Sequence, residues 1–325
     1  MASIYRSSIM KTLNKVTGRL FLLILLLGLC TLSGCGMRQT KEETQEDREE
    51  TVISQSSEDV ENPEEISAED QESEEESEPK EPVTMAQLFR EMGTGGPKAG
   101  EPLPDTVLWF NATYAPLTYS NGWDWRLLGG MEASPYNQSV QKYLLERDWK
   151  IEDRESALEQ LEWLEQKGQR ETYRKYLKEL QEKKLLDLDE DTFLEALANT
   201  EMDGYLYRYY MVYTMYHEGR DENDMAAWDL CRINQLCADF YFCKYMSYEE
   251  AMDVSLRNSL RLQKMYSSWE EMVGSYMLGY QFWQSDPCAT DDSPTLERYR
   301  YYDELLEMED GPYSLDWNMT LEKAW

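Results

Sequence analysis

The chain has 325 residues and a formal net charge of −32, and 30% of its residues are charged. An excess of acidic groups this large argues against nucleic acid as a partner, because the phosphate backbone would repel it. The single histidine, His217, excludes zinc sites built on several histidines and would have to serve any histidine-dependent catalysis alone. It lies near the end of an aromatic segment before Gly219, where a cationic side chain suits a helix C-terminus.

Residues 1–34 have the features of a secretory signal peptide. A basic region without acidic residues comes first, and residues 20–32 then form an apolar run of 13. A membrane helix needs about 20 apolar residues, so a cleaved signal is favoured over a permanent span. The basic residues of this segment are Arg6, Lys11, Lys15 and Arg19.

The quartet Leu-Ser-Gly-Cys at residues 32–35 is similar to the lipobox of bacterial lipoproteins. In a lipobox the cysteine receives a diacylglycerol group and becomes the first residue after cleavage. The resemblance predicts that Cys35 is lipidated and anchors the protein at the extracytoplasmic face of a bacterial cell membrane, since two acyl chains suffice for stable anchoring. An ordinary signal peptide with an unrelated cysteine is the alternative. A start at Met10 instead of Met1 would leave the same compact signal.

Residues 35–83 read as the lipidated cysteine followed by a disordered acidic linker. Between residues 36 and 82 there are 19 acidic and four basic residues and no aromatic residue. A segment of this composition cannot bury enough apolar surface to offset the entropy lost on ordering. As a flexible coil it would span on the order of 40 Å, so we expect a tether that holds the folded part away from the membrane.

Residues 84–325 are expected to form one mostly helical domain, so the fold class predicted from the sequence is all-α. Residues 83–325 keep a net charge of −21, which suits a basic partner or divalent cations, although a solvated acidic surface is the simpler interpretation. We expect short helices in a looser first part at residues 106–143. Apolar periodicity predicts helices over 153–168, with Gly168 just past the C-terminus, and over 170–188.

Two later helices begin with patterns typical of capping boxes. Ser247 is followed by Glu250, and Ser268 is followed by Glu271.

The segment at residues 226–243 places three cysteines at a spacing of six. Six helical residues advance about 9 Å and about 240°, so Cys231, Cys237 and Cys243 point in three directions. They cannot converge on one metal ion, and neighbouring pairs are too far apart for a disulfide. We therefore expect no metal site on this helix, and either buried, inert thiols or an anaerobic organism, with a partner elsewhere such as Cys288 left open for an individual thiol.

The same helix carries a polar pair on an otherwise apolar surface. Asp229 and Arg232 are three residues apart and so share a face, which allows them to pair. Such a pair either fixes the register of a buried helix or lines a ligand pocket, and the sequence leaves both open.

These residues resemble the bacterial domain-of-unknown-function family 1266. The shared pattern is Trp-Asp-x-x-Arg at residues 228–232, a following helix that begins SYEEA, and a later helix with Tyr-x-x-Gly and Phe-Trp. The family often has Gly-His where this chain has Gly168 and Gln169. The resemblance covers roughly residues 106–325, is strongest over 228–283, and implies a helical domain without an assigned activity. Its later positions are Gln263, Tyr266, Ser268, Trp269, Glu270 or Glu271, Tyr276, Gly279, Phe282 and Trp283.

We interpret the chain as a binding or interaction module that recognises a protein partner or a cell-envelope ligand. The alternatives are a carboxylate-dependent hydrolase that acts on the envelope, and a protective lipoprotein of the immunity type. No cofactor is expected and no catalytic residue is assigned. The candidate residues for a pocket or a structural polar cluster are Trp228, Asp229, Arg232, Asn234, Gln263, Ser268, Trp269, Glu270 and Tyr276.

Replacing Cys35 with Ala should release the protein from the membrane fraction, because it removes the predicted site of lipidation. The measurement is immunodetection in soluble and membrane fractions of the producing cell. A protein that stays in the membrane fraction after this substitution would contradict the lipobox assignment.

Overall fold

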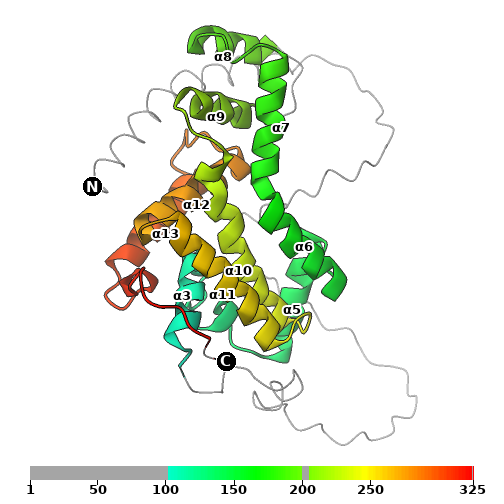
Figure 1. The fold of residues 1–325 in the computed structure, drawn as a ribbon, viewed down its shortest axis with the longest axis vertical. Helices are drawn as coiled ribbons and strands as arrows, with labels where there is room; N and C mark the ends of the chain where they lie inside the picture. The colour runs from blue at the N-terminus through cyan, green and yellow to red at the C-terminus, as the bar shows by residue number, and fades with distance from the viewer. Residues whose placement is uncertain (1–101, 200–204, 324) are drawn as a thin grey trace, which may run out of the picture.

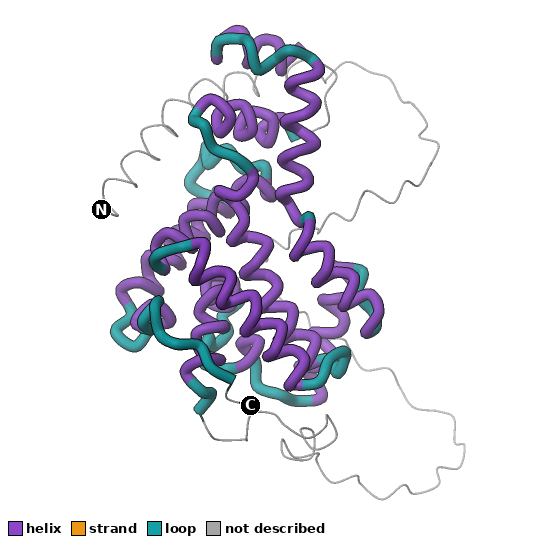
Figure 2. Tube along the Cα trace, in the orientation of Figure 1, coloured by secondary structure: helices purple, strands orange, loops and turns teal. Residues whose placement is uncertain are grey.

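The computed structural model describes residues 102–199, 205–323 and 325, and in this part of the chain the fold is all-α, without strands (Figure 2). The predicted signal peptide, Cys35, the acidic linker and the expected domain start at residue 84 lie outside the described residues and stay predictions. No helix in the described ranges is long and apolar enough to cross a membrane.

The first part of the domain consists of short helices, as the sequence predicts. Pro135 provides the start of α5 and Ser134 caps it, since its side chain accepts a hydrogen bond from the Asn137 backbone N–H. The chain leaves this region through a π-helical turn that ends at Lys150 in the left-handed conformation. The elements are α3 (Asp105–Thr113), α4 (Ala115–Ser120), η1 (Leu128–Gly130), α5 (Pro135–Leu144) and η2 (Leu145–Trp149).

Two consecutive helices, α6 (Arg154–Gln166) and α7 (Gly168–Glu182), are separated by one residue, Lys167. Asp153 and Ser156 form a reciprocal capping box at the start of α6. Gly168 has a φ of +56°, which is the left-handed conformation expected of a residue just past a helix C-terminus. The chain therefore bends at Gly168, and α7 leads away from the larger part of the domain (Figure 1).

α7 continues into a smaller helical group with its own core. Aromatic side chains from α7, α8 (Glu190–Asn199) and α9 (Leu206–His217) pack together, and Phe282 of α12 joins them. Phe193 stacks on Tyr213 with ring centroids 4.0 Å apart. His217 is the last residue of α9, as expected, and its ring lies against Tyr213.

The larger core is built around α10 (Ala226–Phe242), which follows the short helix η3 (Glu222–Met225). In α10 every residue except Gln235 is buried, so its polar groups must find partners inside the protein. The remaining elements are α11 (Tyr248–Met265), α12 (Trp269–Gln284), α13 (Pro294–Glu307) and η4 (Pro312–Ser314).

The predicted starts of α11 and α12 are confirmed, with one difference in detail. Ser247 and Glu250 form the complete capping box. Ser268 accepts a hydrogen bond from the Glu271 backbone N–H, but the Glu271 carboxylate turns to the backbone and side chain of Ser267. The second capping pattern is therefore only half of the reciprocal arrangement.

Candidate functional site

The carboxylate of Asp229 joins the two parts of the fold. It lies on α10 with no exposed surface, and it accepts hydrogen bonds from the Gln169 backbone N–H at 2.9 Å and from Arg170 Nε at 3.0 Å. Lys167 gives α7 no side-chain cap, so Asp229 serves as the cap from another helix. The other end of the Arg170 guanidinium donates to the carbonyls of Leu164 and Glu165, the last turn of α6.

Gly168 is required at this joint for two reasons. Its positive φ favours glycine, and a methyl group in its place would overlap the Asp229 carboxylate. Burial raises the pKa of Asp229, while the Gln169 N–H and the guanidinium of Arg170 oppose that rise. The sequence analysis expects Asp229 and Arg232 to share a face but misses Arg170, whose Nε lies 3.0 Å from the Asp229 carboxylate.

The Arg232 guanidinium packs against two tryptophan rings. Its guanidinium carbon is 4.1 Å from the Trp149 ring centroid and 4.7 Å from that of Trp228. Arg232 still lowers the pKa of Asp229 through its charge, so the two residues belong to one polar cluster. The planar guanidinium suits this sandwich better than a lysine ammonium would.

Trp228 occupies the space left by a second glycine, Gly279. A methyl group at Gly279 of α12 would overlap the Cβ of Trp228, so only glycine allows the two helices to approach this closely. The indole then packs against Tyr276, Tyr280 and Trp283, with centroid distances of 5.1, 5.4 and 5.6 Å. Its Nε1 is buried and has no hydrogen-bond partner among the described residues.

Arg298 of α13 closes the far side of these rings. Its Nη1 donates to the Tyr276 hydroxyl at 3.2 Å, and its guanidinium carbon is 4.5 Å from the Tyr280 ring centroid. Burial raises the pKa of Tyr276 to about 12, so that phenol stays neutral at pH 7. No ion pair joins Arg298 to a carboxylate in the described part of the chain.

Asn234 belongs to a different buried network, which ties three helices together. Its Nδ2 donates to Thr113 of α3 and Ser259 of α11, and its Oδ1 accepts from Asn258 Nδ2 at 2.9 Å. Asn258 also donates to the carbonyl of Leu230. Asn234 therefore fulfils a packing role on the side of α10 away from Trp228.

The other candidates hold the C-terminal segment against the core. Gln263 Nε2 donates to the carbonyls of Trp317 and Met319, and Trp269 Nε1 donates to the carbonyl of Leu315 at 2.7 Å. Ser268 caps α12 and Glu270 is exposed on its first turn. Of the nine candidates, only Trp228, Asp229, Arg232 and Tyr276 come together.

A family model of proteins of unknown function, DUF1266, matches residues 144–317, which is more than half of the chain and includes the whole Trp228–Asp229 cluster. The chain belongs to the DUF1266 family. The resemblance that the sequence suggests is thus confirmed for this domain.

Two relatives from Escherichia coli (strain K12) match part of this chain. The uncharacterized protein YbeR is 29% identical over 105 residues, which are 32% of this chain and 43% of YbeR. The uncharacterized protein YbeU is 30% identical over 82 residues, which are 25% of this chain and 35% of YbeU. The chain thus matches less than half the length of each relative. No solved structure matches it.

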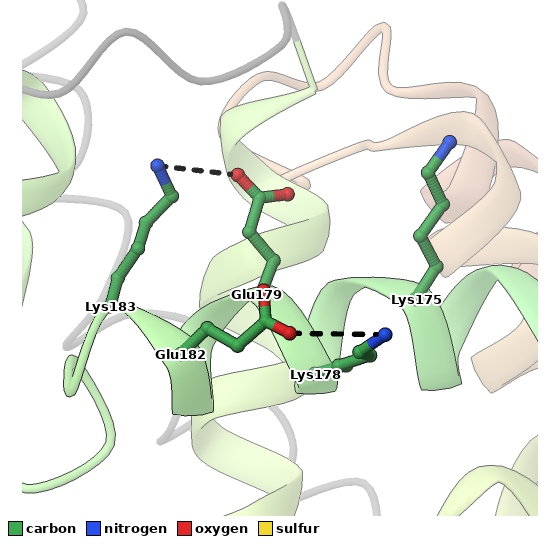
Figure 3. Close-up of a pocket in the computed structure, with 5 residues that line it drawn as sticks. All are labelled: Lys175, Lys178, Glu179, Glu182 and Lys183. Carbon is green, nitrogen blue, oxygen red and sulfur yellow. Dashed lines mark ion pairs between the residues drawn. The ribbon is translucent and has the colours of Figure 1, made fainter.

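Two surface hollows of the DUF1266 domain lie away from this cluster. One of about 410 Å³ runs along α7, where Lys183 and Lys178 hold Glu179 and Glu182 in ion pairs (Figure 3). The alternative of a carboxylate-dependent hydrolase stays a prediction. The second hollow, of about 110 Å³, is a groove between α6 and α11.

The cysteines of the DUF1266 domain are buried and unbridged within the described residues. Burial raises the pKa of each thiol, to about 12 for Cys237 and Cys288, so none is a reactive thiolate at neutral pH. In the same ranges no group of three or more His, Cys, Asp or Glu side chains could hold a metal ion.

A second buried carboxyl group, Asp239, lies ten residues beyond Asp229 in the same helix, α10. Among the described residues its side-chain hydrogen bond comes from Gln235 Nε2 at 3.3 Å, and Gly129 packs beside it. Burial raises the pKa of Asp239 from 3.8 to about 8, against a small lowering by Gln235. The folded protein therefore keeps this group largely protonated at neutral pH.

Asp239→Asn should stabilise the protein increasingly from about pH 4 to about pH 8. Across that range the unfolded chain loses the Asp239 proton and the folded chain retains it, so the wild-type stability falls as pH rises. Each unit of pKa difference corresponds to about 1.4 kcal/mol. Denaturant unfolding at several pH values measures the difference in free energy of unfolding.

The matched control is Asp187→Asn, which alters an exposed carboxyl group and should follow the wild type at every pH. A difference between Asp239→Asn and wild type that does not change with pH would show that Asp239 is ionised in the folded state.

Proposed function

We propose that this chain is a binding module of the bacterial cell envelope, tethered through Cys35, and that its DUF1266 domain binds an anionic group at Arg298. The observation that supports the proposal most directly is the setting of Arg298. A guanidinium is always charged in proteins, and here its neighbours are a phenol that stays neutral and the face of a second tyrosine.

An arginine with no ion pair to any described carboxylate is unusual in a domain this acidic. Residues 83–325 carry a net charge of −21, so acidic side chains are plentiful, yet Arg298 packs among aromatic rings. A partly buried cation without an anion costs free energy that an incoming carboxylate or phosphate would recover. Arg298 is therefore the charged group that a ligand would complete.

The surroundings of Arg298 indicate what else the ligand carries. Trp283 is half-buried beside Tyr280, with ring centroids 6.0 Å apart, and so offers part of an aromatic face next to the guanidinium. Flat apolar faces of sugars or aromatic groups pack on such rings. We infer a ligand with a carboxylate or phosphate next to a ring, which is common chemistry in cell-envelope material.

Three sugars test the proposal because they share the N-acetylglucosamine ring and differ in whether a carboxylate, a phosphate or no anionic group is attached to it. N-acetylmuramic acid and N-acetylglucosamine 1-phosphate carry an anionic group, whereas N-acetylglucosamine is neutral. Calorimetric titration of the full-length chain should detect the two anionic sugars, and Arg298→Met should weaken binding by about tenfold or more, as expected for a charge-assisted hydrogen bond.

Arg300→Met is the control, because Arg300 lies two residues on in α13 and is exposed. It should bind like the wild type, and thermal unfolding should show that Arg298→Met is still folded. Equal affinity for neutral and charged sugars, or unchanged binding by folded Arg298→Met, would refute the proposal.

A further inference from the structure

The groove between α6 and α11 has walls of opposite charge. Both helices pack on α10, whose Ile233 forms part of the floor, and Leu161 and Val254 line the two sides. Arg154 of α6 forms a salt bridge with Glu250 of α11 and closes one end of the groove. Glu165 on α6 and Arg261 on α11 both line the same hollow. Each lies eleven residues, or about three turns, beyond the salt-bridged residue of its own helix. The two helices therefore run parallel in matched register.

The α6 wall is acidic. Glu155, Glu162 and Glu165 are exposed and lie within about 80° of one another around the helix, in one stripe with Leu158. None of these three carboxylates forms an ion pair within the described residues. Leu158 is 40% exposed at the centre of this stripe.

The α11 wall is basic. Arg257, Arg261 and Lys264 lie in one stripe with Leu260, which is 39% exposed. The acidic residues of the same helix lie in its first half and have cationic partners, because Glu250 pairs with Arg154 while Glu249 and Asp253 share Lys323. The second half of α11 is therefore a cationic surface on an acidic protein.

We propose that this face binds a second copy of the same chain. A two-fold axis that runs along the groove would place α6 of each copy over α11 of the other, with the helices parallel and the acidic wall against the basic wall. An axis across the groove would place each helix over its own copy and oppose like charges. Only the first arrangement makes the surface complementary to itself.

Apolar contacts complete the match. The matched register brings Leu158 of one copy to the height of Val254 and Arg257 of the other, at the mouth of the groove. The hollow of about 110 Å³ has room for roughly four water molecules, which is comparable to one leucine side chain. In this arrangement Leu158 of each copy contacts α11 of the other copy, and each acidic stripe faces a basic stripe.

The size of this face predicts a weak, reversible dimer. Helices of 13 and 18 residues are about 20 and 27 Å long, which gives roughly 400 Å² per copy and places the contact at the lower end of specific interfaces. Charges on the two copies also repel at long range. Screening reaches about 8 Å at 0.15 M salt and about 3 Å at 1 M, so the dimer should be strongest at intermediate salt.

Charge reversal tests the pairing. One variant combines Glu162→Lys and Glu165→Lys on α6, and the other combines Arg257→Glu and Arg261→Glu on α11. In sedimentation of the full-length chain in detergent, the wild type should dimerise as concentration rises and each variant should be monomeric. A mixture of the two variants should form dimers again, because both of its helix contacts pair opposite charges.

Glu195→Lys with Glu307→Lys is the control, since it makes the same charge change on exposed residues of α8 and α13 and should leave the dimer intact. Thermal unfolding checks that every variant is folded. A wild type that stays monomeric at about 100 μM, or a mixture that fails to dimerise, would overturn the proposal. Capture of an acidic peptide by a monomeric wild type would assign the groove to an acidic partner instead.

Discussion

A single carboxylate, Asp229, holds the domain together at the point where its two cores meet. It caps the start of α7 from inside α10, while its partner Arg170 also satisfies the last carbonyls of α6. Backbone groups at both ends of the α6–α7 bend, which would otherwise be buried without partners, are thus satisfied by one ion pair. The close approach is possible because residue 168 is glycine, and the second core reaches the first through this bend.

The Trp-Asp-x-x-Arg sequence at residues 228–232 has a direct physical explanation in this arrangement. Trp228 fills the space left by Gly279, Asp229 fills the space left by Gly168, and Arg232 lies between two indoles. These residues build the framework around which α7 and α12 are set. The groups available to partners lie beyond it, at Arg298 and at the walls of the groove between α6 and α11.

Local sequence patterns predict where the helices begin and end, but they do not reveal which residues from distant parts of the chain pair with one another. Capping serines, apolar periodicity and Gly168 gave helix starts and stops because each signal depends on residues within one or two turns. The sequence suggests a pairing of Asp229 with Arg232 for the same reason, since helix periodicity reveals neighbours three or four residues apart. Arg170 lies 59 residues away, and Arg298 is brought to Tyr276 only by the packing of α13 on α12.

The central claim is that the pairing of Asp229 with Arg170 stabilises the whole domain, and a double-mutant cycle tests it most directly. Free energies of unfolding would be measured for Asp229→Asn, Arg170→Met and the double variant. Each single change should cost about 3 to 5 kcal/mol because it leaves a buried charge or polar group uncompensated, and the double variant should lose much less than the sum. Additive losses to within about 0.5 kcal/mol would contradict the account.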